Sequence, residues 1–134
     1  MKIKSEKLGI NSTPATLFVG VGGIGSDIVT RVAEMCAPGE DANLRFVAMD
    51  TNANDLRGVK SSTANIIPIQ TSSPQSVLDY LKNDDDARNY WFPNNTTLYP
   101  KTVSEGAGQV RAISRLALNA TIKTGEIQKL YKAI

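Results

Sequence analysis

Regular structure is first predicted at a short apolar run that ends in glycine. Residues 15–20 (Ala-Thr-Leu-Phe-Val-Gly) have the pattern of a buried strand. From Gly25 the apolar residues recur at helical spacing, which predicts an amphipathic helix that stops at Pro38-Gly39. The apolar face of this helix is expected to consist of Ile28, Val29, Val32, Met35 and Cys36.

Two further apolar runs predict two more strands. Residues 44–49 (Leu-Arg-Phe-Val-Ala-Met) lead into Asp50, and residues 65–70 (Asn-Ile-Ile-Pro-Ile-Gln) follow. Pro68 lacks a backbone N–H, so the last strand should lie at an edge of the sheet or end early. Strand, helix and strand in this order imply a right-handed crossover. The predicted fold class is therefore α/β, a Rossmann-like parallel sheet flanked by helices.

The middle of the chain alternates between a short helix and irregular segments. Ser73 and Pro74 are predicted to be the N-cap and first residue of a helix marked by Val77 and Leu81. This helix runs into three adjacent aspartates, residues 84–86, which we interpret as a solvated loop rather than a metal site. Residues 89–104 are rich in proline and asparagine and predict a long loop, of a length that is often functional. Its aromatic cluster, residues 90–92, is expected to form a small core beneath the loop.

A last amphipathic helix is predicted to begin near Gly108. Thr124-Gly125 should break or kink it. Its apolar stripe is expected to consist of Ile113, Leu116, Ala117 and Ala120, and to resume after the break with Ile127, Leu130, Tyr131 and Ile134.

Composition is typical of one globular domain. The chain has 134 residues, of which 41% are hydrophobic and 21% charged. We expect residues 1–14 to form an N-terminal tail and residues 15–134 to form the domain. A net charge of +2 is too small by itself to indicate a nucleic-acid or anionic membrane partner, and we expect neither. No apolar run approaches the roughly 20 residues of a membrane span. No signal-peptide pattern is present, so a cytoplasmic protein is expected.

Two residue counts limit the chemistry of the chain. Cys36 is the only cysteine, which excludes an internal disulfide bond. Histidine is absent, which excludes Ser-His and Cys-His catalysis and removes the commonest metal ligand. We therefore assign no catalytic residue and no metal site, and expect a phosphate-handling role that uses backbone amides, carboxylates, hydroxyls and arginines.

The first predicted strand and helix are joined by a glycine motif. Gly20, Gly22 and Gly25 satisfy G-x-G-x-x-G in the structural context that phosphate binding requires. A side chain at Gly22 or Gly23 would hold the backbone amides away from a phosphate. The start of the helix directs free N–H groups and a positive dipole end toward the same anion, and Ser26 adds a hydroxyl. We favour nucleotide binding over a glycine turn that only packs the helix on the sheet.

Two nucleotide-binding classes share this motif and differ downstream. In dinucleotide-binding Rossmann domains an acid at the end of the second strand binds the adenosine ribose, and Asp50 occupies that place. Ubiquitin-activating-like adenylating enzymes also carry an acid after this strand, but of their further features only residues 54–57 (Asn-Asp-Leu-Arg) give a faint match.

Three segments in order resemble the nucleotide loops of the tubulin/FtsZ family. They are residues 20–26 (Gly-Val-Gly-Gly-Ile-Gly-Ser), residues 48–56 (Ala-Met-Asp-Thr-Asn-Ala-Asn-Asp-Leu) and residues 105–109 (Glu-Gly-Ala-Gly-Gln). The likeness is closest to bacterial tubulin-like proteins, in which a Gly-Ala-Gly-Gln loop precedes an arginine-bearing helix. It spans about residues 16–120, with residues 68–102 largely unmatched.

This resemblance implies a role for each matching residue, with GTP or GDP as the ligand. The first loop would surround the α- and β-phosphates with Gly22, Gly23, Gly25 and Ser26. The second loop would lie near the phosphates, and near any Mg²⁺ carried by the nucleotide, with Asp50, Thr51 and Asn52. The third loop would contact the terminal phosphate with Gly106, Ala107 and Gly108. Arg115 aligns with an arginine that FtsZ places near the ribose, whereas Arg111, one turn earlier, is as easily a surface charge.

The chain departs from the family pattern in several places. Residues 50–53 read Asp-Thr-Asn-Ala where FtsZ has Asn-Thr-Asp-Ala, and a ribose-binding glutamate expected near Ala112 is absent. The Asn-Pro after the third FtsZ loop is replaced by Val110-Arg111. The family's Gly-Gly-Gly-Thr-Gly-Ser loop would follow the next strand, beyond Ile134.

The resemblance therefore implies the N-terminal half of a tubulin/FtsZ-like GTPase domain. Hydrolysis and self-association into filaments would belong to the full-length protein, and the fragment alone is not expected to be catalytic. One alternative is an NAD- or FAD-dependent oxidoreductase fragment, which has no reason to carry the loop at Gly106. The other is an interaction module that keeps the fold but binds no nucleotide; an atom filling the space above Gly22 and Gly23 would favour it.

Overall fold

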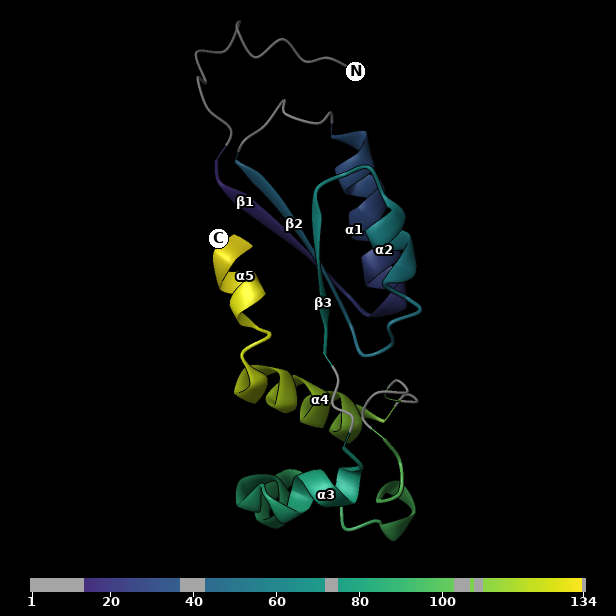
Figure 1. Ribbon diagram of the computed structural model, residues 1–134, viewed down its shortest axis with the longest axis vertical. Helices are drawn as coiled ribbons and strands as arrows, with labels where there is room; N and C mark the ends of the chain where they lie inside the picture. The colour runs from purple at the N-terminus through teal and green to yellow at the C-terminus, as the bar shows by residue number, and fades with distance from the viewer. Residues whose placement is uncertain (1–13, 37–42, 72–74, 103–106, 108–109, 134) are drawn as a thin grey trace, which may run out of the picture.

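The protein has an α/β fold built on a three-stranded parallel sheet that is flanked by helices (Figure 1). The computed structural model describes residues 14–36, 43–71, 75–102, 107 and 110–133. The strands are β1 (Thr16–Val21), β2 (Leu44–Asp50) and β3 (Ile66–Gln70), in the spatial order β1-β2-β3. The three predicted strands are confirmed to within one residue at each end. β3, which contains Pro68, is an edge strand of this sheet.

One face of the sheet is covered by α1 (Gly22–Met35) and by α2 (Arg57–Ser61), a short helix that the apolar pattern did not predict (Figure 1). Phe46 of β2 is paired with Phe18 and Ile66 of the neighbouring strands, and its ring stacks on that of Phe18 with centroids 5.2 Å apart. Side chains alternate between the faces of a strand, so Phe46 and Ala48 pack toward α1 while Val47 faces the other way.

The opposite face is covered by α5 (Gln128–Ala133). Val47 and Ile69, both fully buried, form the core on this side, and Leu130 of α5 packs against them. The chain reaches α5 through Gly125, whose φ of +81° ends α4 (Arg111–Thr124) in the left-handed conformation that glycine adopts without strain. The predicted break at Thr124-Gly125 is confirmed.

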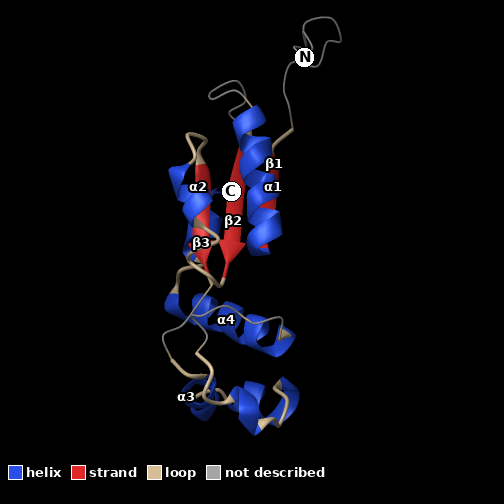
Figure 2. Cartoon of the chain, turned by 90° about the vertical axis from the view of Figure 1, so that its right-hand side faces the viewer, coloured by secondary structure: helices blue, strands red, loops and turns tan. Residues whose placement is uncertain are grey.

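A second hydrophobic cluster lies beyond the carboxyl ends of the strands (Figures 1 and 2). It combines α3 (Val77–Lys82), α4, the π-helical turn η2 (Ala87–Trp91) and the 3₁₀ turn η3 (Thr96–Leu98). We call it the helical cluster. Its buried residues are Val77, Tyr80, Leu81, Ala87, Phe92, Leu98, Ile113, Leu116, Ala117 and Ala120. The predicted stripe of α4 is thus confirmed, although the helix begins at Arg111 and Gly108 lies outside the described residues.

The predicted apolar face of α1 is partly wrong. Val29 is buried, but Ile28 and Met35 are 56% and 85% exposed, and Ser26 and Ala33 take their places against the sheet. The helix begins at Gly22, three residues before its predicted start, and leaves β1 with no loop between them. The close approach of Gly25 to β1 then sets which side of the helix faces the strands. The described helix ends at Met35, and Pro38-Gly39 lies outside the described residues.

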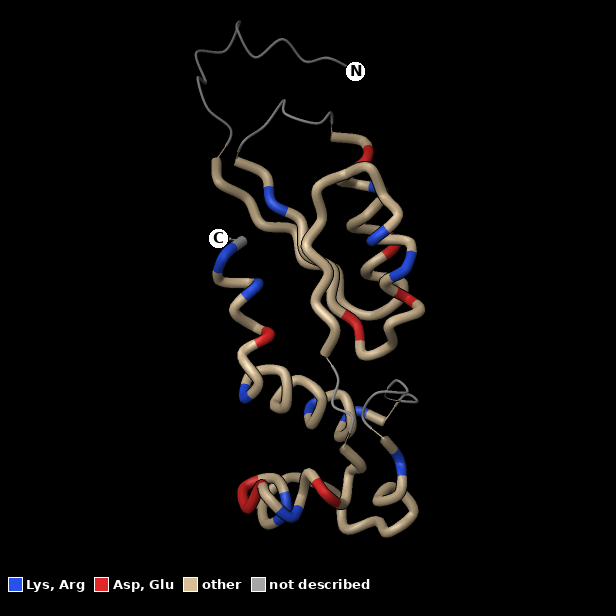
Figure 3. Tube along the Cα trace, in the orientation of Figure 1, with Lys and Arg blue, Asp and Glu red and all other residues tan. Residues whose placement is uncertain are grey.

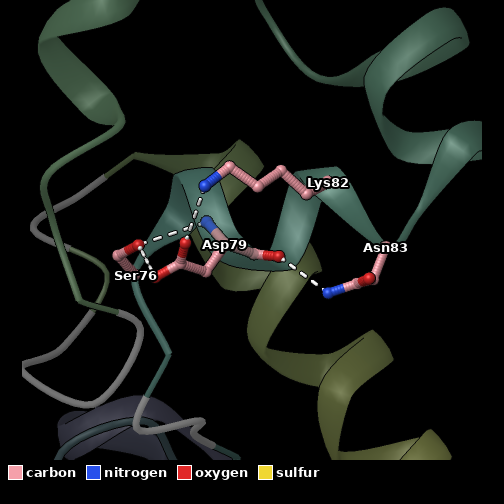
Figure 4. A network of polar contacts seen from close by, with 4 residues as sticks. All are labelled: Ser76, Asp79, Lys82 and Asn83. Carbon is pink, nitrogen blue, oxygen red and sulfur yellow. Dashed lines mark hydrogen bonds and ion pairs between the residues drawn. The ribbon is translucent and has the colours of Figure 1, made fainter.

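The start of α3 also differs from its prediction. The N-cap is Ser76, whose hydroxyl oxygen accepts a hydrogen bond from the amide of Asp79 at 3.1 Å. In return the hydroxyl donates to the Asp79 carboxylate, which also pairs with Lys82 at 3.2 Å (Figure 4). The Ser76 side chain thereby satisfies the amide of Asp79, and the carbonyls of Lys101 and Tyr99 accept from the amides of Val77 and Leu78. A helix start at Ser73-Pro74 is therefore wrong, and those two residues lie outside the described part of the chain.

The segment after α3 is more ordered and more buried than its polar sequence suggests. Asp84 is only 7% exposed, accepts a hydrogen bond from the amide of Ala87 and forms an ion pair with Lys123 of α4 at 2.9 Å. The interpretation of residues 84–86 as a wholly solvated loop is therefore wrong, because Asp84 caps the helical turn that follows it. Phe92 enters the helical cluster as expected, while Tyr90 is 82% exposed.

The described helices include none that is both long and apolar enough to cross a membrane. Residues 1–13, most of the predicted N-terminal tail, lie outside the described part of the chain.

Candidate functional site

The glycine turn (residues 20–26) takes the chain from β1 into α1 at the carboxyl end of the sheet. A Cβ atom on Gly20 would lie 2.1 Å from the carbonyl oxygen of Gly25 and 2.7 Å from Cγ1 of Val29. Such contacts are far inside van der Waals distance, so Gly20 is required for helix α1 to pack against β1. This part of the motif serves packing.

Gly22 has a different role in the same turn. Its φ is +76°, a conformation that non-glycine residues rarely adopt, and apart from its chain neighbours and its own helix no atom of the described residues lies within 4 Å of the position of its missing Cβ. No side chain caps the N-terminus of α1, and its first turn contains no acid. The amides at this helix start therefore face open space together with the positive end of the helix dipole, an arrangement suited to an anion.

Ser26 lies four residues further along α1, on the side that faces the sheet. Its side chain is fully buried, and its Oγ has no hydrogen-bond partner among the described residues. A buried hydroxyl without a partner costs about 1–3 kcal/mol, so structures rarely leave one without a reason. The Ser26 hydroxyl can therefore donate or accept a hydrogen bond to a group that binds at the glycine turn.

The second loop (residues 50–55) follows β2, the central strand. The side chain of Asp50 is directed to the same face as α1, is 8% exposed and accepts a hydrogen bond from the amide of Asn52 at 2.8 Å. Asn52 in turn accepts from the amide of Asn54 at 3.0 Å. The amide of Thr71, just after β3, donates to the carbonyl of Asp50 at 2.8 Å. One carboxylate oxygen of Asp50 therefore holds the loop in shape, and Thr51 and Asn52 are half-buried within it.

Asp55 brings the two loops together. A Cβ atom built on Gly23 would lie 3.5 Å from both Cγ and Oδ2 of Asp55, so this carboxylate stands beside the glycine turn at ordinary contact distance. The carboxylate is exposed and forms no ion pair among the described residues. The space above Gly22 is open, and above Gly23 only an exposed side chain approaches. Sequence analysis assigned Asp55 no role, because only the fold places it across from Gly23.

The third predicted loop is only partly described. Gly106 and Gly108 lie outside the described residues, and Ala107 alone is placed. Ala107 is half-buried against the helical cluster, and its carbonyl accepts a hydrogen bond from the amide of Val110 at 2.9 Å, just before α4. The role of this loop at a terminal phosphate stays a prediction.

Arg115 lies on α4 with its guanidinium carbon 4.1 Å from the centre of the Trp91 ring. This is a cation–π contact within the helical cluster, which gives the arginine a structural partner. Arg111 is exposed at the start of α4. The predicted contact of Arg115 with a ribose therefore stays a prediction.

Metal ligands do not gather anywhere in the described part of the chain, where no group of three acids or cysteines could hold an ion.

A family model described as tubulin like matches residues 17–134, nearly the whole chain. The chain belongs to the tubulin-like family. A search of curated proteins and a search of solved structures found no match. The family match confirms the resemblance that the three glycine- and acid-bearing loops predicted, and it extends through the helical cluster and α5.

In this tubulin-like chain the first two loops lie side by side at the carboxyl end of the sheet. That edge is where open parallel α/β sheets bind their ligands. The glycine turn supplies uncapped amides and the Ser26 hydroxyl, which has no partner among the described residues. The second loop supplies the carboxylates of Asp50 and Asp55, and a hydrogen bond to Asp50 holds its backbone in place.

Proposed function

We propose that this tubulin-like chain binds the phosphates of a guanine nucleotide at the glycine turn, with GTP or GDP as the ligand. The observation that carries the proposal is the start of α1. Its amides are uncapped, Gly22 holds the left-handed conformation that exposes them, and nothing occupies the space above that glycine.

Ser26 supports the same assignment. Its buried hydroxyl lacks a partner among the residues that the structure describes, and a phosphate oxygen above the first turn of α1 would be a suitable acceptor. Gly23 and Gly25 complete the set of small residues, because neither presents a side chain between the amides and an incoming anion. Asp50, Thr51 and Asn52 would then border the phosphates from the second loop.

The choice of guanine rests on family membership, since the described residues near the turn include no group that would read a base. Arg115 would have to leave the Trp91 ring to reach a ribose. Gly106, Ala107 and Gly108 would contribute amides to the terminal phosphate if the third loop closes over the turn.

The test is a titration of the purified chain with GTP, ATP and NAD, followed by calorimetry or by fluorescence of labelled nucleotides. GTP is expected to bind more tightly than the other two. Equal affinity for all three would reduce the site to a general phosphate cradle, and preference for NAD would support the oxidoreductase alternative. Absence of binding would favour the interaction module.

The chain offers a matched pair of variants for this titration. Gly22→Val and Gly125→Val each place a branched side chain at a φ near +80° with nothing within 4 Å, so the two carry similar backbone strain. Only Gly22 borders the proposed site. Gly22→Val is expected to weaken GTP binding at least about tenfold, because it costs roughly one interaction between amides and phosphate. Gly125→Val should bind as the parent does; equal losses in both would remove the glycine turn from the site.

A further inference from the structure

The two edges of the sheet are protected to different extents. β3 has Pro68 in its middle, and the amide of Thr71, just after β3, donates to the carbonyl of Asp50 in β2. Because amides alternate in direction along a strand, the nitrogen of Pro68 faces outward, where it offers no N–H to an approaching strand. β1 contains neither a proline nor a charged residue (Figure 3). Native proteins normally protect a sheet edge with such residues, because a free edge pairs readily with another strand.

The free edge of β1 exposes both amides and apolar side chains. The amide of Thr16 donates to the carbonyl of Asn43, next to β2. The amides of Leu17 and Val19 therefore face away from β2, and no strand in the described part of the chain pairs with them. Val19 and Val21 are 45% and 70% exposed, although the composition of β1 is that of a strand buried on both faces.

Helix α1 continues this apolar edge. Ile24, Ile28 and Met35 recur on a side of α1 that does not contact the sheet, and Ile24 is 81% exposed. The flank of α1 toward α2 is polar instead, since Glu34 accepts a hydrogen bond from the hydroxyl of Ser62, just after α2, at 2.7 Å. In Figure 2 α1 lies over the β1 side of the sheet, with α2 on its other flank. We call the exposed apolar surface of β1 and α1 the β1 edge surface; it consists of Phe18, Val19, Val21, Ile24, Ile28 and Met35.

The β1 edge surface matches a second copy of itself in its dimensions. β1 has six residues and α1 has 14, so both are roughly 20 Å long, and they meet at the carboxyl end of the sheet. Their midpoints, near Val19 and Ile28, therefore lie level with each other. One two-fold axis perpendicular to the sheet would pair the two β1 strands antiparallel and bring the two α1 helices side by side. Because α1 packs on both β1 and β2, the helices would lie about 10 Å apart, a normal packing distance.

The charges of α1 agree with this antiparallel arrangement. Asp27 and Arg31 lie on either side of the middle of the helix and pair with each other at 3.1 Å. Across the two-fold axis, the half of α1 that carries Asp27 would lie beside the half of the other helix that carries Arg31. Opposite charges would thus meet in both halves of the contact, as a two-fold interface requires, whereas a parallel arrangement would bring like charges together.

We propose that this chain forms a two-fold dimer in which the β1 edges of two copies pair antiparallel and join the two three-stranded sheets into one. The partner is a second copy because a single surface is complementary to itself in length, charge and apolar character. The pairing places the two glycine turns at opposite ends of the joined sheet. Dimerisation therefore does not depend on a bound nucleotide, and it stands apart from the proposed function.

The test is the mass of the purified chain, measured without nucleotide by sedimentation equilibrium over a range of concentrations. We expect the mass to approach twice 14.4 kDa as the concentration rises and to go no further. A single-chain mass at every concentration would overturn the proposal. Growth beyond two chains would overturn it as well, because an antiparallel pair leaves no β1 edge free.

Ile28→Lys and Ile122→Lys are a matched pair for this measurement. Both isoleucines lie on helices of 14 residues and are exposed to a similar extent, 56% and 52%, so neither lysine should unfold the chain. Ile28 is at the centre of the proposed contact, whereas Ile122 belongs to α4. Ile28→Lys should weaken the dimer at least about tenfold, because it removes apolar contacts and brings like charges together near the axis. Ile122→Lys should dimerise as the parent does; equal behaviour of the two variants would overturn the proposal.

Hydrogen exchange of the unmodified chain is a second measurement. In the dimer the amides of Leu17 and Val19 are bonded across the axis, and they should exchange at least about tenfold more slowly than in dilute, monomeric samples. The amide of Phe18 faces β2 and should exchange slowly in both. Fast exchange of Leu17 and Val19 in the dimer would exclude this interface. Slow exchange at every concentration would mean that another segment of the chain covers the edge, which would equally overturn the proposal.

Discussion

At the scale of single residues, the glycines of this chain are required for different physical reasons. Gly20 is required because a Cβ would overlap the backbone of Gly25, whereas Gly22 is required by its positive φ alone. Gly58 of α2 meets neither condition, since its φ is ordinary and nothing lies within 4 Å of its Cβ position. A glycine-rich motif therefore does not mean that each glycine contacts a ligand.

These differences predict opposite effects of the same substitution. Gly20→Ala should destabilise the chain by about 3 kcal/mol or more, because β1 and α1 must separate to admit the methyl group. Gly58→Ala should stabilise it by about 0.4–1 kcal/mol, because alanine restricts the unfolded chain and favours the helix. Urea unfolding of both variants checks the pair. A small effect of Gly20→Ala would mean that the helix moves away from β1 at little cost.

At the scale of elements, the ends of the helices are defined by local hydrogen bonds more than by the apolar pattern. α3 has only six residues and depends on the reciprocal bonds between Ser76 and Asp79 at its start (Figure 4). Asn83 closes its other end by donating to the carbonyl of Asp79 at 3.2 Å. The hydrogen bond from the Ser76 hydroxyl and the charge of Lys82 hold the pKa of Asp79 below its ordinary value.

Ser76→Ala tests this cap. The substitution should destabilise the chain by about 1 kcal/mol, the usual effect of losing an N-cap, and should raise the pKa of Asp79 toward its ordinary value. Urea unfolding and NMR titration of the Asp79 carboxyl are the measurements. Ser114→Ala is the control, because Ser114 is exposed in the first turn of α4 without being its N-cap and should change stability by less than about 0.5 kcal/mol. An unchanged Asp79 pKa in Ser76→Ala would contradict the capping role.

At the scale of the whole molecule, two hydrophobic units meet at the carboxyl ends of the strands. One is the sheet with α1, α2 and α5; the other is the helical cluster, in which Asp84, just after α3, forms an ion pair with Lys123 of α4. Lys123 also lies over the ring of Tyr80, 5.3 Å from its centre. This polar group at the rim of a buried cluster makes stability depend on pH at both extremes.

The direction of that dependence follows from three pKa shifts. The amide of Ala87 and the charge of Lys123 lower the pKa of Asp84, so this contribution is lost as the pH falls below about 4. The hydrogen bond to Asp84 raises the pKa of Lys123, and burial raises the pKa of Tyr80. Both contributions are lost as the pH rises beyond about 10.

Asp84→Asn should therefore destabilise the chain by about 1 kcal/mol at pH 7, a modest value because Lys123 is more than half exposed. The difference from the parent should shrink at pH 3, because the lowered pKa of Asp84 in the folded chain lets the unfolded chain take up the proton more readily there. Asp85→Asn is the control, since its ion pair with Arg88 is on the surface and should contribute little. Urea unfolding of the three proteins at both pH values would refute this account if the Asp84→Asn difference were independent of pH.

Sequence alone predicted the three strands, the stripe of α4 and the break at Gly125, because apolar periodicity and glycine chemistry act over a few neighbouring residues. Three loop motifs in the sequence also predicted a resemblance to the tubulin family, and the family match confirms that the chain belongs to it. Gly22, Ser26 and Asp50 were predicted as site residues in this way, and their contact with a nucleotide stays a prediction.

Only the tertiary structure decided which side of α1 is buried, because that depends on how closely Gly25 approaches β1. Only the tertiary structure showed that Asp84 is a buried cap rather than a surface acid, because it forms an ion pair with Lys123, 39 residues away along the chain. It alone set Asp55 beside Gly23, since the two meet only once β1 and β2 pair in parallel and end together. Contacts between residues distant along the chain leave no periodic trace in either segment, and they decide which charges an incoming ligand meets.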